Sequence, residues 1–196
     1  MKRKISYIIV ILAILFAVLL QYLLDSCLRH LSYWAEFQVI VWWVSAFSIY
    51  ILLWKWVDWF LWKKKFFRKI FSIDRVDLSG KWKGKICSSY SWANEKSTKE
   101  IDVVINISQS LTTMSIHTST HQSKSSSIIA DVVSFNGIWH VYYVYVNKPG
   151  YGRDTWMNMH SGYSELVYDA PEQVLDGNYS TFIERGNTGT IKLQRQ

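Results

Sequence analysis

The sequence has only two cysteines among its 196 residues, Cys27 and Cys87. Neither belongs to a C-x-x-C pair, which excludes a disulfide framework and a cysteine-based metal or redox motif. Signatures of catalysis are absent as well: there is no H-E-x-x-H, no G-x-S-x-G, no P-loop and no G-x-G-x-x-G. These absences favour a protein that is not an enzyme and uses no metal or cofactor.

The residue types that could still support catalysis are scattered along the chain. The histidines that could bind a metal are His117, His121, His140 and His160, and the candidate acidic pair partners are Asp131, Asp154, Glu165 and Glu184. They fall in different expected elements and show no ligand spacing. We therefore interpret the histidines as hydrogen-bonded or exposed strand residues.

Charge is missing from two long stretches, residues 5–24 and 37–54. A bilayer core about 30 Å thick needs about 20 apolar residues in a helix, so each stretch predicts a transmembrane helix. A cleaved signal peptide is the alternative for the first stretch, because Lys2, Arg3 and Lys4 precede it. The length of the apolar run and the second span soon after it favour a retained helix.

The net charge of +7 is concentrated near the predicted spans. Residues 1–79 hold eleven Lys/Arg against five Asp/Glu, whereas residues 80–196 hold eleven against ten. A duplex-binding domain would carry its own basic excess, so the pattern argues against DNA or RNA duplexes as partners. Basic residues flank both outer ends of the hairpin, which predicts that both termini and the β domain are cytoplasmic.

Three segments follow from these patterns: a helical hairpin at 1–62, a basic amphipathic linker at 63–79 and a β domain at 80–196. Within the linker, residues 63–76, "KKKFFRKIFSIDRV", are expected to continue the second helix and to rest on an anionic membrane surface. From residue 80 helical periodicity is absent and polar–apolar alternation predicts strands. The expected strands cover residues 80–91, 98–109, 111–120, 125–135, 138–147, 156–168, 173–184 and 188–195.

Eight strands with short connections predict an eight-stranded antiparallel up-and-down β-barrel, with a two-sheet sandwich as the alternative. In "GKWKGKI" the alternation places Lys81, Lys83 and Lys85 outside and Trp82 inside. The same phase in later strands makes one end of the interior apolar and the other polar. That arrangement suits a ligand-binding barrel, although a fully packed core is an equally common outcome.

Aromatic and basic residues near the expected polar end are the binding candidates: Thr118, Tyr143, Tyr145, Tyr151, Arg153 and Trp156. Aromatic faces can stack on nucleobases, and a guanidinium in the long loop 148–154 can hold a phosphate. For Arg153 a salt bridge with Asp154 is the alternative, and for Thr118 an ordinary strand position.

The order of two spans, a basic juncture, "LSGKWKGKI" and a closing "LDGNYSTFIERGNTGTIKLQR" resembles a known family over the whole chain. It is similar to the two-transmembrane, β-barrel effectors of bacterial cyclic-oligonucleotide-based anti-phage signalling systems. The resemblance implies a barrel that senses a cyclic dinucleotide. It also implies self-association into homo-oligomers and disruption of the lipid bilayer, which kills the infected cell.

Two other functions remain open from the residues. The first is a membrane-tethered, lipocalin-like carrier of a lipid or other hydrophobic molecule, which would need an apolar cavity. The second is a structural subunit with a filled barrel and no ligand. Small residues in the spans, Ala17, Ser45, Ala46 and Ser48, are where helices could approach closely.

Overall fold

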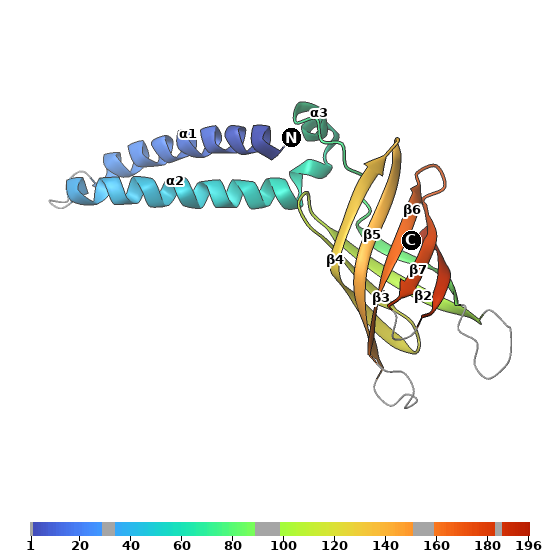
Figure 1. Ribbon diagram of the computed structural model, residues 1–196. Coiled ribbons are helices and arrows are strands. Elements are labelled where there is room, and N and C mark those ends of the chain that lie inside the picture. Colours follow the sequence, from blue (N-terminus) through green and yellow to red (C-terminus); the bar gives the residue numbers. More distant parts are fainter. Residues whose placement is uncertain (1, 29–33, 89–98, 151–158, 183–185) are drawn as a thin grey trace. The chain divides into compact units, whose positions relative to one another are not determined.

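The computed structural model describes residues 2–28, 34–88, 99–150, 159–182 and 186–196. The chain divides into two compact units, Met1–Asp74 and Arg75–Gln196. The first is helical and the second is a β-barrel (Figure 1). Tyr151, Arg153 and Trp156, which the sequence predicts as binding residues, lie outside the described residues.

The helical unit contains α1 (Lys2–Leu28) and α2 (Trp34–Trp59), which pack against each other. Two segments, Tyr7–Cys27 and Ile40–Lys63, are long and apolar enough to cross a membrane. Most of their side chains are exposed, unlike those of a core helix in a soluble protein. Ala17 is fully buried, Ser45 and Ala46 are half-buried, and Ser48 is exposed.

The second helix does not continue into the linker, so that expectation was wrong. After α2 comes a 3-10 turn, η1 (Leu61–Lys63), then an extended residue, Lys64, and then the short α3 (Lys65–Ile70). Positively charged side chains stabilise the C-terminal end of a helix, and three consecutive lysines, Lys63–Lys65, follow the end of α2. The turn also leaves Trp62 completely buried. On α3 itself Phe66 and Ile70 are exposed apolar residues.

The barrel unit is a closed, antiparallel meander in which each strand pairs with the next and β1 pairs with β8. This confirms the eight-stranded up-and-down barrel and excludes the sandwich. Its strands are β1 (Gly80–Ser88), β2 (Lys99–Gln109), β3 (Met114–Ser119), β4 (Ser123–Phe135), β5 (Ile138–Pro149), β6 (His160–Asp169), β7 (Val174–Thr181) and β8 (Thr188–Arg195).

Alternation explains which side chains face the interior. Lys81, Lys83 and Lys85 are exposed while Trp82, between them, is buried, as the sequence predicts. The buried phase of the following strands fills the interior with Val103, Ile105, Ile107, Met114, Ile116, Val132, Val141, Leu166, Leu175, Ile191 and Leu193. In β4 a bulge between Ser127 and Ile129 adds one residue, so the inward-facing positions change from Ser125 and Ser127 before it to Ala130 and Val132 after it.

One end of the barrel, which we call the closed end, is where the chain passes from the helical unit into β1. Here the Trp82 indole Nε1 donates a hydrogen bond to the Leu78 carbonyl at 3.0 Å, and Leu78 is itself buried. The Arg195 guanidinium lies 5.5 Å from the centre of the Trp82 ring. Arg195 also donates to the Ser79 carbonyl at 2.6 Å. These contacts fill the closed end.

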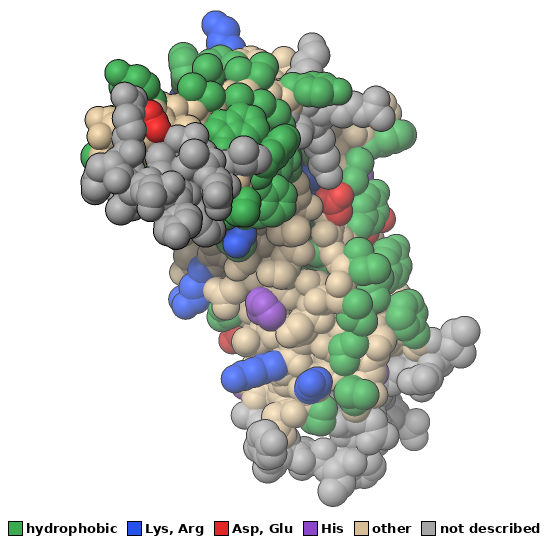
Figure 2. All heavy atoms as spheres, turned by 90° about the vertical axis from the view of Figure 1, so that its left-hand side faces the viewer, with side chains coloured by type: hydrophobic (Ala, Val, Ile, Leu, Met, Phe, Trp, Pro, Cys, Tyr) green, Lys and Arg blue, Asp and Glu red, His purple; other side chains and the backbone are tan. Residues whose placement is uncertain are grey.

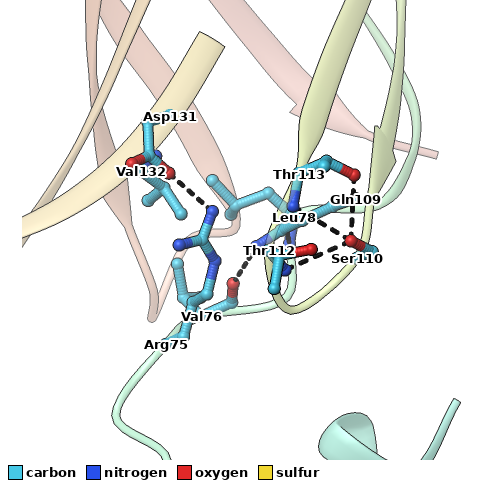
Figure 3. Close-up of polar contacts among 9 residues, drawn as sticks. All are labelled: Arg75, Val76, Leu78, Gln109, Ser110, Thr112, Thr113, Asp131 and Val132. Carbon is cyan, nitrogen blue, oxygen red and sulfur yellow. Dashed lines mark hydrogen bonds and ion pairs between the residues drawn. The ribbon is translucent and has the colours of Figure 1, made fainter. Parts of the chain in front are cut away.

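Gln109 fixes the segment that leads into β1 (Figure 3). Its side-chain oxygen accepts from the Leu78 backbone N–H, and its amide nitrogen donates to the Val76 carbonyl, both at 2.8 Å. Nearby, the Arg75 guanidinium contacts an Asp131 carboxylate oxygen at 2.6 Å. The first residues of the unit are thereby attached to β2 and β4.

Candidate functional site

The opposite end of the barrel, which we call the polar end, is formed where β1, β3, β5 and β7 finish and β2, β4, β6 and β8 begin. Its inward-facing residues are polar where those of the closed end are apolar. They are Ser88, Thr118, Ser125, Ser127, Tyr143, Tyr145, Asn147, Ser164, Tyr179 and Thr181. The polar end is therefore the candidate ligand site.

Strand register places these side chains around one ring of the wall. On one side Tyr143 pairs with Ser164, and Ser164 pairs in turn with Tyr179. On the other side Asn147 of β5 pairs with Ser125 of β4. The structure places the predicted residues Thr118, Tyr143 and Tyr145 together at this end, where all three face inward from β3 and β5, and their contact with a ligand stays a prediction.

Two glycines make room for the tyrosine rings. Gly162 pairs with Tyr145, and a Cβ built on Gly162 would lie 2.5 Å from the Tyr145 hydroxyl. Gly189 pairs with Tyr179, and its Cβ would lie 2.5 Å from the Tyr179 ring. Both glycines occupy inward-facing positions, so each tyrosine ring lies over bare backbone on the neighbouring strand. The Tyr179 ring can therefore extend over β8 to reach Ser88 of β1.

Several of these hydroxyls already have partners within the barrel. The Tyr179 hydroxyl donates to Ser88 Oγ at 2.8 Å, and Ser164 Oγ donates to the Asn178 carbonyl at 2.9 Å. Thr181 is held by the turn after β7, where its Oγ1 accepts from the Asn187 N–H at 2.8 Å. These residues shape the wall.

Tyr145 and Asn147 are the last two buried residues along β5. Both side chains are largely buried, at 9% and 7% exposure, and both face the interior. An inward-facing phenol and an amide at the end of a barrel can hydrogen-bond a ligand that enters there. Tyr145 and Asn147 are accordingly the strongest candidates for ligand contact.

Both inward-facing tyrosines of β5 are held in the neutral form. Burial raises the pKa of the Tyr143 hydroxyl, while hydrogen bonds with Ser164 and Thr118 oppose the rise. Burial also raises the pKa of Tyr145, and the neighbouring Tyr143 and Tyr179 add to it. A neutral phenol can donate a hydrogen bond to an anionic oxygen and can present an aromatic face to a base.

The rim of the polar end is basic. Lys124 and Lys148 are Cα partners on β4 and β5, and both are exposed. Like charges placed directly opposite each other are unfavourable unless an anion lies nearby. Among the described residues, the acidic side chain at the start of β2, Glu100, contacts Lys85 at 2.5 Å and so is neutralised. The rim therefore favours an anionic ligand.

Sequence reasoning missed Asn147, the two glycines and the lysine pair. Asn147 continues the Tyr143–Tyr145 alternation by one step, so the pattern could have included it. The glycines and lysines gain meaning only from strand register, which pairs residues that are distant in sequence. Tyr151, Arg153 and Trp156 remain predictions, because they lie outside the described residues.

Comparisons with known proteins agree with this geometry. Residues 75–195 match the family model described as Cap15, cyclic dinucleotide receptor domain. The matched range covers nearly all of the barrel unit. The chain is also similar to CD-NTase-associated protein 15 from Staphylococcus schleiferi, at 29% identity over 136 residues, which is 69% of each chain.

The resemblance seen in the sequence, to β-barrel effectors of cyclic-oligonucleotide-based anti-phage signalling, is thereby confirmed. The two candidate membrane helices that precede the barrel fit the same architecture. On the match over residues 75–195, the chain belongs to the Cap15 cyclic dinucleotide receptor domain family.

Proposed function

We propose that the barrel binds a cyclic dinucleotide at its polar end and acts as a non-enzymatic receptor. The observation that carries the proposal is the group of inward-facing polar and aromatic side chains at the polar end, Tyr145 and Asn147 among them, beside the exposed pair Lys124 and Lys148. A cyclic dinucleotide has two phosphates and two bases. Basic rim residues suit the phosphates, and tyrosine rings suit the bases.

In this proposal Tyr145 stacks on a base or donates to a phosphate, Asn147 hydrogen-bonds a base edge, and Lys124 and Lys148 attract the dianion. Thr118 and Tyr143 hold the wall beside them through their mutual hydrogen bond. Arg153, Tyr151 and Trp156 would complete the site from the loop after β5. Loss of one charged contact to a phosphate, as in Arg153→Ala, is expected to cost about 1.5–3 kcal/mol in affinity.

The helical unit would anchor the receptor in a bacterial inner membrane as a two-span hairpin, with both termini and the barrel in the cytoplasm. Its exposed apolar surface and the basic segment Lys63–Lys65 support this orientation. Ligand binding would promote self-association of the anchored chains, and the gathered spans would disrupt the bilayer. This is the response that kills an infected cell.

Titration of the full-length chain in detergent against a panel of cyclic dinucleotides tests the proposal. The panel comprises cyclic di-AMP, cyclic di-GMP and mixed purine–pyrimidine members. We expect saturable binding of at least one member in detergent. In a separate assay, the same member should release dye from lipid vesicles that carry the chain. A chain that binds a fatty acid but no member of the panel would instead be a lipid carrier. A melting temperature that no small molecule shifts would indicate a filled structural barrel.

A further inference from the structure

The outer surface of β4, β5 and β6 is apolar, which is unusual for strands that face water. Eight large side chains on it are between 36% and 68% exposed: Ile128, Ile129, Val133, Phe135, Ile138, Tyr142, Tyr163 and Val167. We call this surface the β4–β6 face. Figure 2 shows apolar side chains in a column along one side of the barrel. Such a surface is typical of an interaction site.

The rest of the described outer wall is different. Outward positions of β1, β2, β7 and β8 carry Lys81, Lys83, Lys85, Glu100, Asp102, Asn106, Asp176, Thr190, Lys192 and Gln194. Alternation alone would allow polar residues on β4, β5 and β6 as well. Isolated apolar residues on a surface are common, but register joins these into one patch: Ile129 pairs with Val144, which pairs with Tyr163. The barrel therefore has one apolar side and one charged side.

The charges within the β4–β6 face are already paired. Asp131 contacts Arg75 at 2.6 Å. Glu165 accepts a hydrogen bond from the Tyr142 hydroxyl at 3.0 Å, and His140 Nδ1 lies 3.1 Å from the same carboxylate oxygen. An interface that covered these groups would not leave a lone charge without a partner, which is the costly outcome. A hydrocarbon environment would exclude them, so the face suits a protein partner better than lipid.

The area and the tether indicate which protein. Eight side chains exposed to this extent offer several hundred Å², close to the roughly 800 Å² that each partner contributes to a standard interface. The first strand of each barrel begins about 20 residues after the end of α2 at Trp59. Copies anchored in one membrane would be held at a high effective concentration, which favours a second copy as the partner. We propose that the β4–β6 face packs against the same face of a second copy, related by a twofold axis.

The proposed interface and the candidate ligand site share β5. Tyr143, Tyr145 and Asn147 point inward from this strand, while Tyr142, Val144 and Val146 alternate with them on the outside. Contacts with the ligand and with the second copy thus lie one residue apart. This inference rests on the proposed function for its ligand dependence, and the face itself can be tested without any ligand.

Crosslinking in membranes tests the interface. The full-length chain with Cys27→Ser and Cys87→Ser would be reconstituted into phosphatidylethanolamine–phosphatidylglycerol vesicles and treated with a short bifunctional maleimide. Tyr163→Cys, on the β4–β6 face, is expected to give a covalent dimer. Thr190→Cys, on the charged side, is the matched reporter and is expected to give almost none. Equal crosslinking of the two reporters would overturn the proposal.

A charge placed in the interface provides the second measurement. Ile129→Glu in the Tyr163→Cys chain should lower the crosslinked fraction at least about tenfold, because an unpaired carboxylate would be buried. Asn106→Glu, the same charge on the outer face of β2, should change it by less than about twofold. Circular dichroism checks folding, with Val167→Lys as a second interface variant. Unchanged crosslinking in both folded interface variants would refute the inference.

The ligand panel separates this inference from the proposed function. Ile129→Glu should bind the same cyclic dinucleotide as the unmodified chain. Its affinity should be reduced by no more than about twofold, apart from the part of the affinity that comes from coupling between ligand binding and association of two copies. If no panel member binds any chain, the proposed function fails, and crosslinking without nucleotide still decides the interface. If nucleotide binds but Tyr163→Cys gives no dimer with or without it, the interface fails alone.

Discussion

Replacing Trp82 with alanine should destabilise the barrel strongly, because Trp82 fills the closed end. The side chain is completely buried, packs edge-on against Tyr168 with ring centres 6.1 Å apart, and donates to the Leu78 carbonyl. Truncation of a buried tryptophan costs about 3–5 kcal/mol. The Leu78 carbonyl would also lose its partner, for about 1 kcal/mol more. The total is a large part of the 5–15 kcal/mol by which a typical domain is stable.

For a barrel of this size we expect the melting temperature to fall by about 15–20 °C. Thermal unfolding of the full-length chain in detergent, followed by circular dichroism in the β-sheet region, measures the change. Trp82→Phe keeps an aromatic ring but not the donor, so its loss should be about 1–3 kcal/mol. Lys83→Ala, on the exposed side of the same strand, should stay within about 0.5 kcal/mol. A Trp82→Ala chain that melts within 4 °C of the original would refute the account of the closed end.

Three further predictions concern the barrel. Gln109→Leu should cost about 2–4 kcal/mol in chemical denaturation, because it removes the partners of the Leu78 N–H and the Val76 carbonyl; a loss under 0.5 kcal/mol would contradict the role of Gln109. Gly162→Ala should lower the free energy of unfolding by about 1–3 kcal/mol, since the new Cβ meets both the Tyr145 hydroxyl and the Ser180 carbonyl at 2.5 Å. An unchanged melting temperature would contradict this prediction, because it would mean that β6 shifts to accommodate the methyl group. Burial raises the pKa of Tyr143 and Tyr145 above the usual value of about 10, so the folded state holds their protons more tightly than the unfolded state. The free energy of unfolding should therefore fall as the pH rises above about 10. Tyrosinate absorbance during an alkaline titration measures this, and Tyr145→Phe should weaken the decline.

The barrel could be predicted from the sequence because its signal is local. Alternation in "GKWKGKI" is enough to place Trp82 inside and the lysines outside, and short connections are enough to order the strands. The break at Lys64 was not predictable in this way. The segment has the composition of a continuing amphipathic helix, and the break follows from charge at the helix end and from the burial of Trp62.

The candidate site was predicted only in part, for a related reason. Thr118, Tyr143 and Tyr145 follow from the phase of their own strands. The space that receives the Tyr145 ring depends on Gly162, which lies on another strand, and the lysine pair at the rim depends on the register between β4 and β5. Cross-strand neighbours are set by tertiary pairing, which the phase of one strand does not specify.

The central claim is that a cyclic dinucleotide binds inside the polar end through the inward face of β5. Calorimetric titration of the full-length chain with the tightest-binding member of the panel, comparing Tyr145→Ala with Tyr142→Ala, tests it most directly. The two tyrosines lie three residues apart on one strand but point to opposite sides. Tyr145→Ala should weaken binding by about 1–3 kcal/mol, or about 5- to 150-fold, through lost stacking, while Tyr142→Ala should change it by less than about twofold. Equal effects of the two substitutions, or a larger loss for Tyr142→Ala, would contradict the account.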